Sequence, residues 1–256
     1  MSEEVFLKHQ AQITPHPKAL EIKEAKGMYI KDIHENQYLD LVAGVSANTL
    51  GHSHPALVNA VKSQLEKYMH VMVYGEYIQS PQYQLAKLLA ENLPSSLNCT
   101  YLVNSGCEAI EGAMKLAKRV TRKTEFFSCK NSYHGSSQGA LSLMGTEVYK
   151  TNYRPLLPNC HRIEFNSEKC LQKITKKTAA VVVEPVQGAT GFVTPKNNWL
   201  QKLRLRCNKV GALLIFDEIQ TCYGRTGKLF ALETYGVTPD ILCIAKGMGG
   251  GMPIGA

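Results

Sequence analysis

The sequence lacks a long apolar run, an N-terminal leader and any pair of cysteines at metal-binding spacing. Without an apolar run of about 20 residues, no membrane-spanning helix is expected. The first residues, Met1-Ser2-Glu3-Glu4, contain no basic-then-apolar stretch, so neither secretion nor organelle import is indicated and a cytoplasmic location is expected. The eight cysteines never form Cys-x-x-Cys, which argues against zinc and disulfides and for reduced thiols.

The sequence also gives little support for a nucleic-acid or metal site, despite a net charge of +8. One predicted helix face is basic, with Lys115, Lys118, Arg119, Arg122 and Lys123. These residues lie opposite an apolar stripe, near the helix C-terminus and without interleaved aromatics, so we interpret them as a solvated face. The pair His52 and His54 has no third ligand nearby, so no metal is expected.

The order of apolar runs and helical stretches predicts an α/β protein. With 256 residues and 44% hydrophobic content, the chain can bury a sizeable core. Residues 28–33 and 38–42 are short β-like runs that we assign to a small accessory domain. Helices are expected to begin at Pro55 and at Ser80-Pro81, and strands alternate with helices from Thr100 onward. No internal repeat or low-complexity tract is evident.

Polar side chains stand at the ends of several predicted strands. Asp217 ends the apolar run 213–217, Lys246 follows the run 240–245, and Glu184 ends the run 179–184. The run 101–104 breaks at Ser105, which is expected to cap a helix, and Tyr133 follows the strand 125–129. Ligands of open α/β sheets bind outside the carboxyl ends of the strands, so these residues could converge.

A lysine, a carboxylate and a helix N-terminus in one site suit pyridoxal phosphate (PLP). A buried lysine amine can condense with the PLP aldehyde, and a carboxylate can hold the pyridine nitrogen protonated. The N-H groups at the start of a helix suit a phosphate dianion, and an aromatic ring can stack on the cofactor. The segment from Gly106 to Gly112 has one intervening residue too many for a Walker loop, and no Gly-Lys-Ser/Thr follows.

The motifs, taken in order, resemble those of the class III PLP-dependent aminotransferases, in the branch of the ornithine and acetylornithine enzymes. The resemblance runs from about Gly27 to the last residue. It is carried by Asn104-Ser105-Gly106-Cys107-Glu108-Ala109, Tyr133-His134-Gly135, Glu184-Pro185-Val186-Gln187-Gly188, Asp217-Glu218-Ile219-Gln220, Gly224-Arg225-Thr226-Gly227 and Ala245-Lys246-Gly247.

This resemblance implies a role for each matching residue. Lys246 would form the aldimine and Asp217 would pair with the pyridine nitrogen, which makes these two the expected catalytic residues. The expected cofactor-binding residues include Asp217 and Lys246 themselves, with Ser105, Gly106 and Cys107 at the phosphate. Tyr133 and Ile219 would lie on the two faces of the cofactor ring, Gln220 would lie near its phenolic oxygen, and Glu184 would orient the neighbouring residues.

The resemblance further implies the large domain of fold-type I PLP enzymes, with a mostly parallel sheet flanked by helices, plus an incomplete small domain. Residues 1–45 would be the N-terminal segment of the small domain. Residues 46–256 would be the PLP-binding large domain, cut short, and the C-terminal small domain would be absent from this chain. A homodimer that takes small-molecule substrates, with no nucleic-acid or membrane partner, is expected.

The expected function is transfer of an amino group from an amino acid, of ornithine or acetylornithine type or another donor, to a 2-oxo acid. Two departures affect the donor: Ser136 stands where the branch typically has an arginine, and Ala189 where it has a glutamate. Cys107 replaces the usual threonine, serine or alanine. An alanine–glyoxylate-type aminotransferase, a PLP aminomutase or racemase of the same fold, and an inactive PLP-binding fragment stay open as alternatives.

Overall fold

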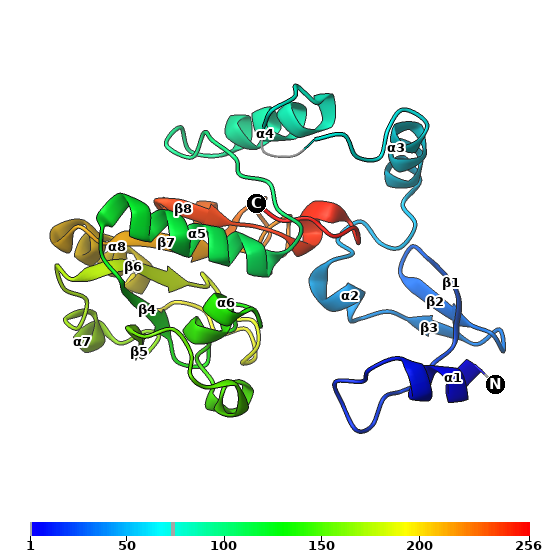
Figure 1. Ribbon diagram of the computed structural model, residues 1–256, viewed down its shortest axis with the longest axis horizontal. Helices are drawn as coiled ribbons and strands as arrows, with labels where there is room; N and C mark the ends of the chain where they lie inside the picture. Colours follow the sequence, from blue (N-terminus) through cyan, green and yellow to red (C-terminus); the bar gives the residue numbers. More distant parts are fainter. Residues whose placement is uncertain (1, 73–74) are drawn as a thin grey trace. The chain divides into compact units, whose positions relative to one another are not determined.

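The computed structural model describes residues 2–72 and 75–256 and divides into two compact units, Met1–Val71 and Met72–Ala256 (Figure 1). The predicted domain boundary between residues 45 and 46 lies inside the first unit, and the assignment of residues 1–45 to a small domain stays a prediction. Among the described residues, no helix combines the length and apolar character needed to cross a bilayer.

The first unit is built on a three-stranded antiparallel sheet in the order β1-β2-β3. Its strands are β1 (Ile22–Lys26), β2 (Tyr29–Asp32) and β3 (Gln37–Leu39), and its helices are α1 (Ser2–His9), α2 (Ala43–Ser46) and α3 (Pro55–Leu65). The predicted runs 28–33 and 38–42 correspond to β2 and β3, and α3 begins at Pro55 as expected. Strand β1 was missed because it is mostly exposed and carries three charged residues in five, which leaves no apolar alternation.

The second unit contains a five-stranded sheet in the order β5-β4-β6-β7-β8, in which every neighbouring pair is parallel. The strands are β4 (Glu125–Cys129), β5 (Cys160–Ile163), β6 (Thr178–Val183), β7 (Leu213–Asp217) and β8 (Ile241–Cys243). Strand β6 is buried along its whole length, as expected for the centre of a parallel sheet covered on both faces. The predicted α/β class with a mostly parallel sheet is confirmed.

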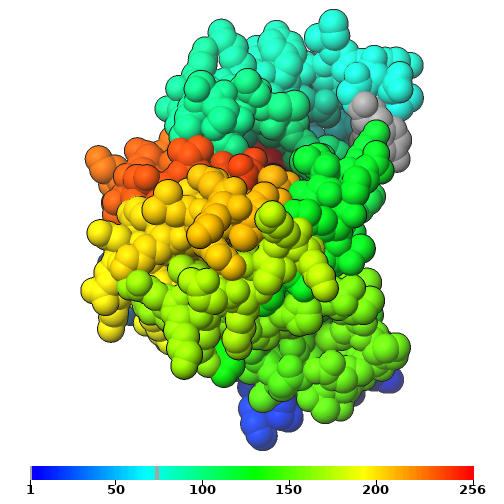
Figure 2. Space-filling model, turned by 90° about the vertical axis from the view of Figure 1, so that its left-hand side faces the viewer, coloured from blue at the N-terminus to red at the C-terminus, as the bar shows by residue number. Residues whose placement is uncertain are grey.

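Helices cover both faces of this sheet. The helices are α4 (Ser80–Asn92), α5 (Gly106–Thr121), α6 (Gln138–Leu143), α7 (Glu168–Leu171), α8 (Trp199–Val210) and α9 (Ala231–Tyr235), with 3-10 turns η1 (Glu147–Tyr149), η2 (Thr151–Tyr153) and η3 (Lys246–Gly249). Because side chains alternate along a strand, Ala180 and Val182 pack in one core with α5 and α6, whereas Val181 and Val183 pack in another with α7 and α8. Figure 1 shows α5 along the sheet, and Figure 2 shows the yellow to orange part of the chain, which includes α8, at the surface.

The predicted strand 101–104 is the main difference from the sequence prediction within this unit. Only Val103 pairs, in an isolated antiparallel bridge with Gly255, and the backbone of Ala256 pairs with that of Ile244. A strand needs a neighbour along its whole length, and the described residues offer this segment one partner residue. The helix predicted after it is confirmed, since Ser105 caps α5 by accepting a hydrogen bond from the Glu108 N-H at 3.2 Å.

Candidate functional site

The carboxyl ends of the parallel strands bring the predicted residues to one edge of the sheet. Glu184 directly follows β6, Asp217 is the last residue of β7, and Lys246 comes three residues after β8. Val183 pairs with Phe216, and Asp217 pairs with Cys243, so these strands end at the same level. Tyr133 lies in the loop after β4, which pairs with β6. The edge therefore carries a cation, two carboxyl groups and an aromatic ring.

Asp217 is held by two hydrogen bonds in a buried position, with 3% of its surface exposed. Its Oδ2 atom lies 2.7 Å from Nδ1 of His134, and its Oδ1 atom accepts a hydrogen bond from the Ile219 N-H at 3.1 Å. The His134 side chain is fully buried, and its Nε2 atom has no hydrogen-bond partner among the residues that the structure describes. These contacts fix the orientation of the Asp217 carboxylate.

His134 is a site residue that was not predicted. The sequence motif contains it, but 83 residues separate it from Asp217, and a lone histidine gives no signal for such a partner. The parallel pairing of β4, β6 and β7 is what brings the two side chains together.

Glu184 connects two loops of the site. Its carboxylate accepts hydrogen bonds from the N-H of Tyr133 at 3.1 Å and of Gly188 at 3.2 Å. Burial is the main cause that raises the pKa of Glu184 to about 7, opposed by His134 and assisted by Asp217. The carboxyl group thus titrates near neutral pH while it holds both loops.

Lys246 is half-buried at the start of η3 and has a positive φ of 42°. Burial lowers the pKa of its amine, because the charged form loses hydration, while the nearby Asp217 and Glu184 carboxylates act in the opposite direction. The electrostatic interaction with both acids means that Lys246 belongs to the same cluster. A lowered pKa favours the neutral amine, which is the form that acts as a nucleophile.

The turn at the start of α5 packs against the other loops through glycines. A Cβ atom on Gly106 would lie 2.7 Å from Cδ1 of Ile219, and one on Gly135 would lie 2.4 Å from Sγ of Cys107. Only glycine allows these approaches. The N-H groups in the first turn of a helix have no partner within the helix, so the turn of residues 105–107 presents donors that an anion can use.

The remaining predicted residues also lie in this cluster. Gln220 packs against the second loop, since a Cβ atom on Gly188 would lie 2.2 Å from its Oε1 atom. The Tyr133 ring is partly exposed and meets the ring of Tyr149 edge-on, with 6.2 Å between centroids and 87° between planes. The structure therefore brings all nine predicted residues together, and the description of their roles stays a prediction.

A hollow lies elsewhere in the second unit. Its volume is about 910 Å³, and it runs along α5 and β8, with Leu93, Leu97, Leu116 and Leu242 among its lining residues. None of the nine predicted residues lines it, and the polar convergence described above is not found there. The titratable groups with shifted pKa values gather at the strand ends, which makes that edge of the sheet the candidate functional site. Within the described residues, no group of histidine, cysteine and acidic side chains has the arrangement of a metal site.

Comparison with known proteins agrees with the resemblance. The family described as aminotransferase class-III matches residues 11–256. The acetylornithine aminotransferase of Methanopyrus kandleri is 44% identical over 232 residues, which cover 90% of this chain and 59% of that protein. The corresponding enzyme of Clostridium acetobutylicum is 42% identical over 240 residues, covering 91% and 60%. The chain thus spans about three fifths of the length of these curated relatives.

Solved structures with the same fold include transaminases. The ornithine aminotransferase of Toxoplasma gondii superposes with a TM-score of 0.89 at 30% identity, covering 100% of this chain and 63% of that one. An amine transaminase from an uncultivated Pseudomonas species, solved in its PLP-bound form, gives 0.86 at 28% identity, covering 96% and 63%. The predicted large-domain fold of the PLP transaminases is thereby confirmed, and the chain belongs to the class-III aminotransferase family.

Proposed function

We propose that this protein is a PLP-dependent aminotransferase that moves an amino group from an ornithine- or acetylornithine-like donor to a 2-oxo acid. The observation that carries the proposal is the cluster at the strand ends, where Lys246 interacts with Asp217 and Glu184 and His134 holds Asp217. The relatives named acetylornithine aminotransferase support amino transfer over the racemase and aminomutase alternatives.

The described residues fit PLP by their chemistry. The turn 105–107 offers N-H donors at a helix N-terminus for the phosphate, and the close approach at Gly106 leaves Ile219 beside that turn. Tyr133 provides an aromatic surface on the neighbouring loop. His134 holds one oxygen of the Asp217 carboxylate, and a carboxylate fixed in this way suits a partner for the N-H of the cofactor's pyridine ring. When bound, PLP supplies an aldehyde and an electron-accepting ring.

The chain's own residues then bind, orient and move protons. The Lys246 amine, with its pKa lowered by burial, is the group that we assign to covalent attachment and to proton transfer at the substrate carbon. Hydrogen bonds from His134 and from the Ile219 N-H fix the orientation of the Asp217 carboxylate. Glu184 keeps the Tyr133 loop in place, and we assign Gln220 to the phenolic oxygen of the cofactor.

The names of the relatives support an ornithine- or acetylornithine-like donor, and two positions limit how such a donor can be bound. Ser136 and Ala189 provide no charge where the ornithine branch typically carries an arginine and a glutamate, so a donor carboxylate must be held by other residues. A homodimer and a cytoplasmic location are part of the same proposal and rest on the resemblance to the family.

The proposal is tested by adding PLP to the purified chain, then offering acetylornithine, ornithine, alanine and putrescine with 2-oxoglutarate or glyoxylate. We expect visible absorbance of the bound cofactor, its bleaching by acetylornithine or ornithine, and formation of glutamate. A chain that stays colourless would contradict PLP binding. A coloured chain that inverts a donor's stereochemistry without transfer would favour a racemase.

A further inference from the structure

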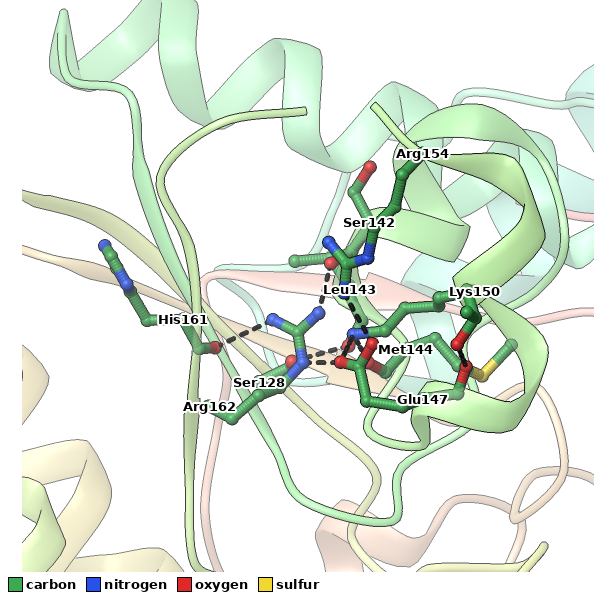
Figure 3. Close-up of polar contacts among 10 residues, drawn as sticks. Ser128, Ser142, Leu143, Met144, Glu147, Lys150, Arg154, His161 and Arg162 are labelled. Carbon is green, nitrogen blue, oxygen red and sulfur yellow. Dashed lines mark hydrogen bonds and ion pairs between the residues drawn. The ribbon is translucent and has the colours of Figure 1, made fainter. Parts of the chain in front are cut away.

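Helix α6 follows the loop that carries Tyr133, and a half-buried arginine from the neighbouring strand holds its C-terminal end (Figure 3). Nε of Arg162, on β5, donates to the carbonyl oxygen of Met144 at 2.8 Å, and Nη2 donates to that of Ser142. Its Nη1 donates to the carbonyl oxygen of His161 at 3.1 Å. All three nitrogens of the guanidinium therefore bind backbone, so this arginine is not offered to a substrate carboxylate.

A second cation binds the same end of the helix. Lys150 is 2% exposed, and its Nζ donates to the carbonyl oxygen of Met144 at 2.9 Å and pairs with Oε1 of Glu147 at 2.9 Å. The last carbonyls of a helix have no partner within the helix and carry partial negative charge, so two cations stabilise this end. Ser128 completes the arrangement by donating to the carbonyl oxygen of Leu143 at 2.5 Å (Figure 3).

The N-terminal end of α6 is fixed as well. Oε1 of Glu111, on α5, accepts hydrogen bonds from Oγ of Ser137 at 2.7 Å and from the N-H groups of Gly139 at 2.6 Å and Ala140 at 3.2 Å. The six-residue helix is thus held at both ends by charged side chains of other elements.

The fixed end of α6 lies directly on the turn before Tyr133. The N-H of Gly145 donates to the carbonyl oxygen of Ser132 at 2.9 Å, and a Cβ atom on Gly145 would lie 2.3 Å from the Ser132 nitrogen and 2.4 Å from that of Asn131. Any movement of Met144, which both cations bind, is therefore transmitted to the backbone next to Tyr133.

A second contact reaches the Tyr133 ring itself. Tyr149 lies in η1, between Glu147 and Lys150, and its ring meets that of Tyr133 edge-on at 6.2 Å. Because the Lys150–Glu147 pair closes this turn, the same cluster determines where the Tyr149 ring stands.

We propose that Arg162 and Lys150 are positioning residues of the cofactor site, which set the Tyr133 loop through Gly145 and the Tyr133 ring through Tyr149. The inference rests on the proposed function, in which Tyr133 lies on the cofactor ring. Arg162 lies on β5, which is the edge strand of the sheet opposite β8, the strand that leads to Lys246.

The test compares Arg162→Gln with a matched variant. Arg206 on α8 also binds backbone, donating from Nε to the carbonyl oxygen of Ile174 at 2.9 Å and from Nη2 to that of Gln172 at 3.2 Å, and both acceptors lie before β6, outside the Tyr133 loop. Arg206→Gln should therefore lower the thermal unfolding temperature by a similar amount without changing the site. Arg162→Gln should raise the Kd for PLP about tenfold, equivalent to about 1.4 kcal/mol, and alter the circular dichroism of bound PLP at saturation.

Two further variants keep the test decisive. Arg162→Lys restores a donor and should recover part of the affinity, and Tyr149→Ala, at a half-exposed ring, should weaken PLP binding with an unchanged unfolding temperature. Hydrogen exchange of the PLP-free chain is measured as well, and residues 130–136 should exchange faster in Arg162→Gln only. Equal PLP affinity, dichroism and loop exchange in Arg162→Gln and Arg206→Gln would overturn the proposal. A wild-type chain that binds no PLP would refute the proposed function, while the exchange comparison would still decide whether the cluster holds the loop.

Discussion

The buried acids at the strand ends make the stability of the chain without cofactor depend on pH in an unusual direction. Burial raises the pKa of both Glu184 and Glu218 to about 7, against 4.5 for the free side chain. Both carboxyls therefore bind a proton in the folded state at pH values where the unfolded chain has lost it. We therefore expect the contribution of these two carboxyls to stability to be complete below about pH 4.5 and to be lost as pH rises through about 7.

The size of this effect follows from the two pKa values. For one carboxyl, the free energy of unfolding should fall by about 2.5 kcal/mol between pH 5 and pH 8, and by about twice that for the pair. Carboxyl groups with lowered pKa values, such as Asp40 and Glu147, lose their contribution only below about pH 4.5, so they do not affect this interval.

The assay is urea unfolding followed by circular dichroism at pH 5, 6, 7 and 8. Glu184→Gln should remove about half of the fall in stability, because one of the two titrating carboxyls is gone. The exposed Glu66→Gln should leave the fall unchanged. If Glu184→Gln kept the full fall, the carboxyl would titrate normally in the folded chain and the buried, electrostatically coupled site described above would be refuted.

Three further substitutions, the last with a matched control, test the site. Asp217→Ala should retain some bound PLP but lose amino transfer, because a hydrogen bond to a charged group contributes about 1.5–3 kcal/mol, and a near-normal rate would refute the role of Asp217. His134→Leu should reduce the rate of amino transfer less than Asp217→Ala, since Asp217 still accepts the hydrogen bond from the Ile219 N-H. Equal rates in His134→Leu and wild type would show that the 2.7 Å contact between His134 and Asp217 is dispensable. Gly135→Ala should destabilise the fold by about 2 kcal/mol or more in thermal unfolding, because φ is 120° and the methyl group would lie 2.4 Å from Sγ of Cys107. Gly191→Ala is the control, since Gly191 has a φ of 91° but open space around it, and it should cost about 1 kcal/mol. Equal losses in the two variants would refute the close approach at Gly135.

The sheet of the second unit could be predicted because its strands are apolar runs that end in a polar residue. The runs 125–129 and 213–217 match β4 and β7, and the helix after Ser105 was signalled by its cap. The charged strand β1 gave no such signal, and the run 101–104 has the composition of a strand but pairs only at Val103. Whether an apolar run becomes a strand depends on its neighbours, which the sequence of the run does not contain.

The site residues on separate strands could be predicted as a set, because the parallel order brings the carboxyl ends together. Partners that act through tertiary contacts could not. His134 pairs with Asp217 across 83 positions, and Glu111 reaches the start of α6 from another helix. Arg162 has an ordinary place in β5, and its importance is visible only in the carbonyl oxygens around its guanidinium.

In the proposed function, the amine of Lys246 and the carboxylate of Asp217 serve one bound PLP molecule. The most direct test is to add PLP, reduce with borohydride, digest the protein and locate the label by mass spectrometry. We predict a stable label on Lys246, lost in Lys246→Ala, with a visible spectrum before reduction that shifts in Asp217→Ala. A label on another lysine, or no label on the folded chain, would contradict the account.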